Sequence, residues 1–132
     1  MNEAHRLFVY GTLITGERNH HLLEHAVQLE KTCYTSGRLV DTGNGYPALV
    51  ENSPETTIGE LYEIDDDLLH EINYLEGYRG EGENNLYERR VQPISAGERH
   101  YDAFVYVFES DRGLPMIPEN DWKEYRQRSS QL

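Results

Sequence analysis

The chain has 132 residues, with 12 Lys and Arg against 24 Asp and Glu, and a formal net charge of −12. So acidic a chain repels phosphates and anionic headgroups, which argues against nucleic acid and anionic membranes as partners. The single cysteine, Cys33, excludes an internal disulfide, and no apolar run resembles a secretion signal or a membrane span. We therefore expect one cytoplasmic domain over residues 1–132, flexible after about residue 126, whose oligomeric state the sequence leaves open.

Negative charge is concentrated between residues 51 and 88, where Arg79 is the only Lys or Arg. One interpretation is a solvated acidic face that keeps the protein soluble. The other is an acidic rim that favours substrates carrying a positive amine.

The first segment, residues 6–10, is apolar and favours a strand, and it breaks at Gly11-Thr12-Leu13. Residues 17–27 have one apolar helical face and predict a helix. Gly11 lets the backbone turn sharply and approach another molecule closely. A loop between a strand and a helix offers main-chain N–H groups to an anion or an oxyanion.

Short strands are predicted next, over residues 36–41 and 46–50, on either side of the turn cluster Thr42-Gly43-Asn44-Gly45. Residues 58–64 predict a further strand. The run Asp65-Asp66-Asp67 then starts a helix that is expected to stop at Gly77.

The polar residues 79–85 predict a loop, and the sequence leaves open whether this loop acts as a lid. Residues 87–94 and 100–108 predict a hairpin. Trp122 and Tyr125 are expected to dock the tail on the body. About six strands and two principal helices, with the strands in clusters, predict an α+β fold whose small mixed sheet curls toward a barrel.

Glu76 lies at the end of the second predicted helix, just before Gly77. A carboxylate there faces the negative end of the helix dipole, which raises its pKa, and burial would raise the pKa further. Carboxylates with raised pKa values are the usual general bases near neutral pH. Glu76 is therefore a candidate catalytic base.

Several motifs together resemble the gamma-glutamylcyclotransferase-like family over roughly residues 6–125. Val9-Tyr10-Gly11-Thr12-Leu13 resembles its signature loop, in the Tyr-Gly-Thr-Leu form of the gamma-glutamylamine branch rather than the Tyr-Gly-Ser-Asn form of the dipeptide branch. Asn120-Asp121-Trp122 is similar to the Gly-Asp-Trp of small bacterial members, with Asn in place of Gly. The other matching motifs are Gly45-Tyr46-Pro47-Ala48, Gly59-Glu60-Leu61-Tyr62, Leu75-Glu76-Gly77 and Tyr87-Glu88-Arg89.

The resemblance implies a small barrel with flanking helices and a cavity between the signature loop and Glu76. It also implies an enzyme that needs no metal or organic cofactor and releases 5-oxoproline and a free amine. In this reaction the substrate's α-amine attacks its own γ-carbonyl, with Glu76 as general acid and base. Gamma-glutamyl amines, including ε-linked gamma-glutamyl-lysine, come ahead of gamma-glutamyl dipeptides as small-molecule substrates. The substrate-binding residues are then Tyr10, Gly11, Thr12 and Leu13, with Tyr46 and Tyr87 as candidate pocket walls.

Two other functions stay open at this point. His21-Leu22-Leu23-Glu24-His25 matches the inverted zinc-peptidase motif, in which two histidines four apart on a helix share a metal, although no third ligand is identifiable. The fold could instead be a non-catalytic module that binds a small acid or a partner protein. A module that binds carboxylates would gain from a neutral or basic residue at position 76, so Glu76 favours catalysis.

Overall fold

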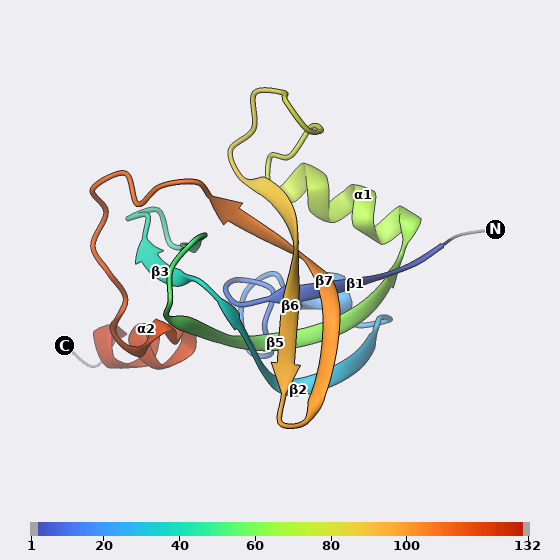
Figure 1. The fold of residues 1–132 in the computed structure, drawn as a ribbon, viewed down its shortest axis with the longest axis horizontal. Coiled ribbons are helices and arrows are strands. Elements are labelled where there is room, and N and C mark those ends of the chain that lie inside the picture. The colour runs from blue at the N-terminus through green and yellow to red at the C-terminus, as the bar shows by residue number, and fades with distance from the viewer. Residues whose placement is uncertain (1–2, 131–132) are drawn as a thin grey trace.

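The computed structural model describes residues 3–130 and consists of a closed sheet flanked by two helices (Figure 1). Its helices are α1 (Asp66–Leu75) and α2 (Trp122–Ser130), with short 3-10 turns at His20–Leu23 and Pro118–Asn120. Its strands are β1 (Ala4–Val9), β2 (Val27–Ser36), β3 (Arg38–Asp41), β4 (Pro47–Val50), β5 (Thr56–Asp65), β6 (Glu88–Ala96) and β7 (Arg99–Phe108).

The seven strands lie in the order β1-β5-β2-β6-β7-β4-β3, and β1 also pairs in parallel with β7 at Leu7 and Phe104. This extra pairing closes β1, β5, β2, β6 and β7 into a five-stranded barrel. The strands β4 and β3 extend the sheet beyond β7, with β4 parallel to β7 and antiparallel to β3. The predicted α+β fold with a barrel-like mixed sheet is thereby confirmed.

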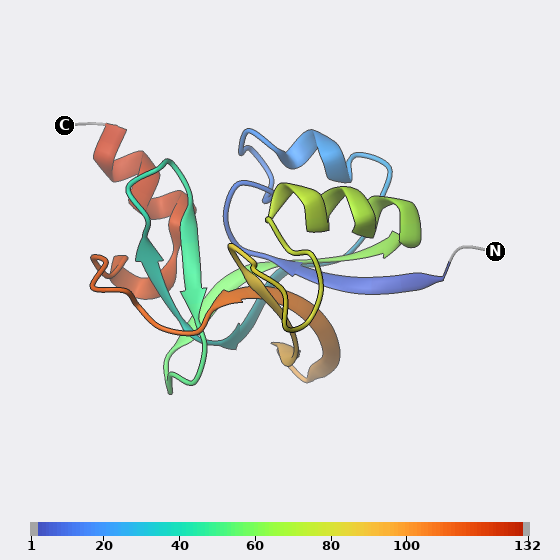
Figure 2. The same ribbon diagram turned by 90° about the horizontal axis from the view of Figure 1, so that it is seen from above.

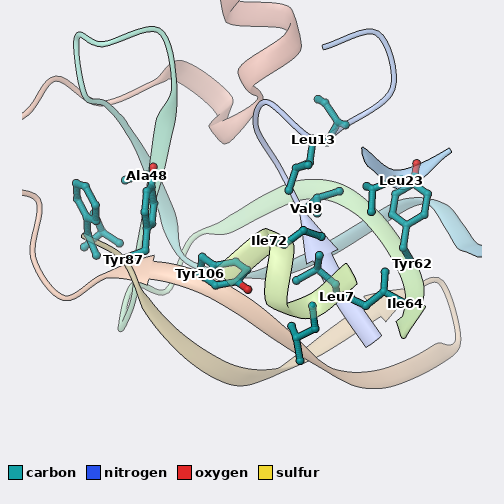
Figure 3. Close-up of a cluster of buried hydrophobic side chains, with 14 of the residues drawn as sticks. Leu7, Val9, Leu13, Leu23, Ala48, Tyr62, Ile64, Ile72, Tyr87 and Tyr106 are labelled. Atoms are coloured by element: carbon teal, nitrogen blue, oxygen red, sulfur yellow. The ribbon is translucent and has the colours of Figure 1, made fainter. Parts of the chain in front are cut away.

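Alternation along β1 divides the apolar core in two. Phe8 belongs to a buried cluster that includes Leu61 and Val105 of neighbouring strands. Leu7 and Val9 belong to a second cluster with Ile72 of α1 (Figure 3). Because successive strand residues point to opposite faces, one strand can serve both clusters. Figure 2 shows α1 lying over this part of the sheet, while α2 lies beside β3 at the far end.

The helix α1 forms as its sequence predicts. The Asp65 carboxylate caps the helix by accepting a hydrogen bond of 2.9 Å from the N–H of Leu68. Glu76 is the C-cap residue, and Gly77 follows with a φ of 66°, a left-handed conformation that suits glycine. The helix therefore ends with Glu76 at a defined position beside the barrel.

The helix predicted over residues 17–27 is wrong. Only His20–Leu23 forms a 3-10 turn, and Val27 already begins β2. The Asn19 side chain donates to Thr12 Oγ1 at 3.0 Å, and the His20 ring nitrogen Nδ1 lies 2.9 Å from the carbonyl oxygen of Leu13. These contacts with the preceding loop outweigh the weak helical propensity of Asn and His.

This correction removes the geometric basis of the zinc hypothesis. With the turn ending at Leu23, His21 and His25 are not held one helical turn apart. The His25 side chain is exposed and pairs with Glu24, while the His21 ring contacts the carbonyl of Arg18.

The expected docking of the tail is confirmed, although the helix α2 was not predicted from the sequence. Trp122 is buried, and its indole N–H donates to Glu17 at 3.0 Å. The Tyr125 hydroxyl donates to Asp41 at 2.7 Å. Asn120 has a φ of 52°, which explains how Asn stands where small bacterial members have Gly. The flexible tail was expected after about residue 126; α2 continues to Ser130, and residues 131–132 lie outside the described part.

Among residues 3–130, the structure has no helix long and apolar enough to cross a membrane.

Candidate active site

A cavity of about 280 Å³ opens beside the barrel where β1 ends and α1 ends. The start of β4 and the segment before β6 complete its walls. All seven residues singled out from the sequence line this cavity: Tyr10, Gly11, Thr12, Leu13, Tyr46, Glu76 and Tyr87. The fold thus brings together four segments that are far apart in the sequence.

Glu76 is half-buried, and it is the one acidic residue among the described residues that line the cavity. Burial raises its pKa to about 7. Its carboxylate accepts no hydrogen bond from any group of residues 3–130, whereas its backbone N–H is bonded to the carbonyl of Ile72 at 2.9 Å. A desolvated and unpaired carboxylate of this kind is suited to take up a proton near neutral pH.

The loop after β1 supplies the opposite kind of group. Its carbonyls are used within the loop, because Gly11 accepts from Ile14 at 3.2 Å and Thr12 accepts from Asn19 at 2.9 Å. The N–H groups of Gly11, Thr12 and Leu13 have no acceptor among residues 3–130. Three successive free donors at a cavity wall can bind a carboxylate or a developing oxyanion.

The tyrosines are rigid walls. The Tyr10 hydroxyl donates to the carbonyl of Tyr106 at 2.7 Å and accepts from the N–H of Leu49 at 3.1 Å. The Tyr87 hydroxyl donates to the carbonyl of Pro47 at 2.6 Å. The Tyr46 ring packs near that of Tyr87, with their centroids 6.2 Å apart. Burial is the main reason that the pKa values of Tyr10 and Tyr87 are raised.

Arg18 and Tyr106 are among the cavity residues that were not singled out from the sequence. Arg18 is exposed and lines the cavity beside Gly45, and its guanidinium forms no ion pair within residues 3–130. The sequence did contain a signal for Arg18, because a cation just after the signature loop is unusual in so acidic a chain. Tyr106, on β7, looked like an ordinary core residue of a strand, and only the tertiary structure places it at this cavity.

Comparison with known families shows which protein family has this fold and sequence. The family model described as gamma-glutamyl cyclotransferase, AIG2-like, matches residues 7–124. The chain belongs to this family. The resemblance noted in the motifs is therefore confirmed, and with it the expectation of an enzyme of the gamma-glutamylcyclotransferase type.

Relatives of this family member are found among curated proteins. The chain is 41% identical over 122 residues to the gamma-L-glutamyl-butirosin B gamma-glutamyl cyclotransferase of Niallia circulans, covering 91% of this chain and 76% of that protein. It is 30% identical to the putative gamma-glutamylcyclotransferase YkqA of Bacillus subtilis, covering 91% of this chain but only 42% of that protein.

Solved structures share the fold. The crystal structure of YkqA matches the whole chain and 44% of its own length, with a TM-score of 0.77 and 28% identity. An AIG2-like protein from Mus musculus matches 86% of each chain, with a TM-score of 0.72 and 25% identity.

Proposed function

We propose that this family member releases 5-oxoproline and a free amine from a gamma-glutamyl amine or peptide, with Glu76 as general acid and base. The observation that carries the proposal is the unpaired Glu76 carboxyl, with a pKa of about 7, in a cavity that is also lined by Gly11, Thr12 and Leu13, whose N–H groups have no acceptor among residues 3–130.

The reaction moves two protons from the α-nitrogen to the departing nitrogen. Glu76 removes a proton from the substrate's α-ammonium group, and the resulting amine attacks the γ-carbonyl carbon. The new C–N bond closes the five-membered ring, and Glu76 returns the proton to the departing nitrogen as the old C–N bond breaks. Glu76, ionised again, then takes the second proton that the ring nitrogen must lose and passes it to the released amine, which leaves as an ammonium ion. The cavity holds a flexible chain in a ring-forming pose, which can remove several kcal/mol of barrier, with ~7 as the lower end for well-oriented systems.

The signature loop and Arg18 bind different anionic groups of the substrate: the loop binds the developing oxyanion, and Arg18 binds the α-carboxylate. The N–H groups of Gly11, Thr12 and Leu13 stabilise the oxyanion that develops at the γ-carbonyl. Arg18 binds the α-carboxylate, because it is a cation without an acidic partner at the cavity. This local positive charge offsets the repulsion that a chain of net charge −12 exerts on a carboxylate.

The leaving group is proposed to be an amine, and a cationic amine is proposed ahead of a neutral one. Gamma-glutamyl amines, including ε-linked gamma-glutamyl-lysine, are proposed ahead of dipeptides because of the Tyr-Gly-Thr-Leu form of the loop. The name of the Niallia circulans relative supports a gamma-glutamyl substrate, since it specifies gamma-L-glutamyl-butirosin B. Residues 1–132 are proposed to act as one cytoplasmic domain without metal or organic cofactor.

The test is release of 5-oxoproline from a panel of gamma-glutamyl amines and dipeptides, measured for the native protein and for Glu76→Gln. Glu71→Gln is the matched control, because Glu71 lies on the same helix and is exposed. Release that is lost only in Glu76→Gln supports the proposal. No release from any member by a folded protein favours the binding module instead, and release that survives Glu76→Gln removes Glu76 from its role.

A further inference from the structure

Three exposed residues mark the mouth of the active-site cavity. Among the described residues that line it, only Arg18, Leu75 and Leu86 are exposed, and all the others are buried or half-buried. Leu75 is 39% exposed and Leu86 is 43% exposed. Single exposed leucines are common on protein surfaces, but these two stand at the mouth of one cavity. The mouth is therefore formed by one cation and by two leucines, which we call the apolar rim.

Both leucines of the apolar rim lie next to Glu76. Leu75 is the last residue of α1 and directly precedes Glu76. Leu86 is more distant in the chain, but its N–H donates to the carbonyl of Gly77 at 2.9 Å. A Cβ atom at position 77 would stand 2.9 Å from the Cβ of Leu86, so this leucine packs directly on the residue that follows Glu76.

The segment that carries Leu86 is held in place by hydrogen bonds. The Asn85 side chain accepts from the N–H of Arg79 at 2.6 Å and donates to the carbonyl of Gly80 at 2.8 Å. The same amide nitrogen donates to the carboxylate of Glu88 at 3.1 Å. Leu86 therefore follows an anchored residue and keeps its place at the cavity.

The chemistry of the proposed reaction directs the leaving group toward the apolar rim. Glu76 must reach the departing nitrogen in order to protonate it, so this nitrogen has to lie at the wall that carries Glu76. The gamma-glutamyl part is bound by the loop after β1 and by Arg18, which offer it hydrogen-bond donors and a positive charge. A cationic amine is repelled by Arg18, and the rest of the exposed mouth is the apolar rim.

We propose that Leu75 and Leu86 form the subsite for the leaving group, and that this subsite takes an amine whose departing nitrogen carries an apolar carbon chain. This inference rests on the proposed function, since it names the part of the substrate that the same cavity receives at its mouth. Each methylene that the leucines cover is removed from water, which favours binding. The chain is still present in the transition state, so the gain appears in kcat/KM.

An amino acid fits this subsite less well as the leaving group. In a gamma-glutamyl dipeptide, a carboxylate is attached to the carbon next to the departing nitrogen. On the apolar rim this carboxylate would lose water without gaining a hydrogen bond, and it would lie near the charge of Glu76. Arg112 donates to the Leu86 carbonyl at 3.5 Å, but it does not line the cavity, and its guanidinium carbon lies 3.7 Å from the centroid of the Phe108 ring.

The test is the release of 5-oxoproline from a homologous series, the gamma-glutamyl amides of methylamine, ethylamine, propylamine and butylamine. In the native protein kcat/KM is expected to rise about two- to fourfold with each added methylene, as burial of part or all of a methylene predicts. The rise is expected to shrink in Leu86→Ala, and further in the double variant with Leu75→Ala. Tyr74→Ala is the matched control and should keep the native rise, because Tyr74 is 90% exposed, directly precedes Leu75 and does not line the cavity.

A second variant tests for a change of preference instead of a loss. Gamma-glutamyl-glycine and the gamma-glutamyl amide of propylamine have leaving groups of similar size, one ending in a carboxylate and the other in a methyl group. In Leu86→Arg the ratio of kcat/KM for the glycine substrate to that for the propylamide is expected to rise about tenfold, because the guanidinium can pair with the carboxylate. A general loss of catalysis would lower both values together and leave this ratio unchanged.

A native series without a rise would overturn the proposal, and so would a full native rise in the double variant. Equal losses for all four amides would show that the leucines act on the fold or on Glu76, and an unchanged ratio in Leu86→Arg would contradict the subsite as well. Thermal melts report whether each variant is folded, and Leu86→Arg supplies the readout if the double variant is not. Absence of release from every substrate by the folded native protein would instead remove the proposed function, and the subsite with it.

Discussion

The ring of Pro47 lies so close to Gly11 that a Cβ atom at position 11 would stand 2.8 Å from both Cγ and Cδ of the proline. The glycine of the signature loop is thus required by a close approach and not by a left-handed φ. The contact joins the loop after β1 to the first residue of β4. The contact also joins two walls of the cavity. One wall is the loop with the free N–H groups, and the other is formed by Tyr46 and by Tyr87, whose hydroxyl donates to the Pro47 carbonyl.

Gly11→Ala is expected to destabilise the protein by about 1–3 kcal/mol and to lower kcat/KM, because the methyl group forces the two walls apart. Denaturant unfolding and steady-state kinetics measure the two effects. Pro47→Ala removes the ring atoms concerned, so Gly11→Ala should cost much less in that background. Equal costs in both backgrounds would show that the clash is not the cause.

The rate of 5-oxoproline release is expected to rise with pH through about 7, because Glu76 must lose its proton to act as a base and its pKa is about 7. The pH profile of kcat/KM measures this rise.

The free energy of unfolding is expected to fall as pH rises over the same range. The folded state holds a proton that the unfolded state releases above its ordinary pKa of 4.5, so the free energy of unfolding falls as pH rises from there through 7. Glu76→Gln removes this loss and should be more stable than the native protein at pH 8, by at most about 3 kcal/mol. Chemical denaturation at pH 4 and pH 8 tests it: a variant with the same pH dependence as the native protein would mean that Glu76 is not the group responsible.

Arg18→Ala is expected to raise KM by about 10- to 100-fold for substrates with a free α-carboxylate, the worth of one charge-assisted hydrogen bond. Analogues in which that carboxylate is a carboxamide should lose little. Arg79→Ala is the matched control, because Arg79 lies outside this cavity and has no ion pair among residues 3–130. Equal losses for carboxylate and carboxamide substrates would assign Arg18 a different role.

Glu17 connects the loop after β1 to the C-terminal helix α2. Its carboxylate accepts from the Trp122 indole at 3.0 Å and pairs with Arg126 at 2.8 Å. Glu17→Ala leaves a buried indole N–H without a partner and is expected to cost about 1–3 kcal/mol of unfolding free energy. Glu17→Gln keeps an acceptor for the indole and should cost less; thermal unfolding of the two variants would show the reverse order if the Arg126 pair were the dominant contact.

Cationic gamma-glutamyl amines are expected to have higher kcat/KM than neutral ones of equal size at low salt, because the chain has a net charge of −12 concentrated around residues 51–88. The advantage should shrink as ionic strength rises, since salt screens exposed charges. The measurement is kcat/KM for a matched pair of amines over a salt series. Equal turnover of the two at low salt would remove charge as a determinant and leave the acidic stretch as a solvated face.

Structural features that depend on residues close together in the chain could be predicted from the sequence. The cap at Asp65, the stop at Gly77 and the alternation along β1 and β7 depend on local hydrogen bonding and side-chain periodicity. The position of Glu76 as the last helical acid followed from the same local logic. So did the signature loop, whose residues stand in one short segment.

Features set by distant partners were not predictable. Residues 17–27 were expected to be helical, yet Asn19 and His20 bind the loop before them and Val27 pairs with β5. Whether Tyr106 was core or cavity wall depended on where α1 would dock. The hydroxyls of Tyr10, Tyr87 and Tyr106 bind acceptors from other segments of the chain. Periodicity reports which face of a strand is buried, but the partner of each buried polar group is chosen only when the barrel closes, because those partners lie far away in the chain.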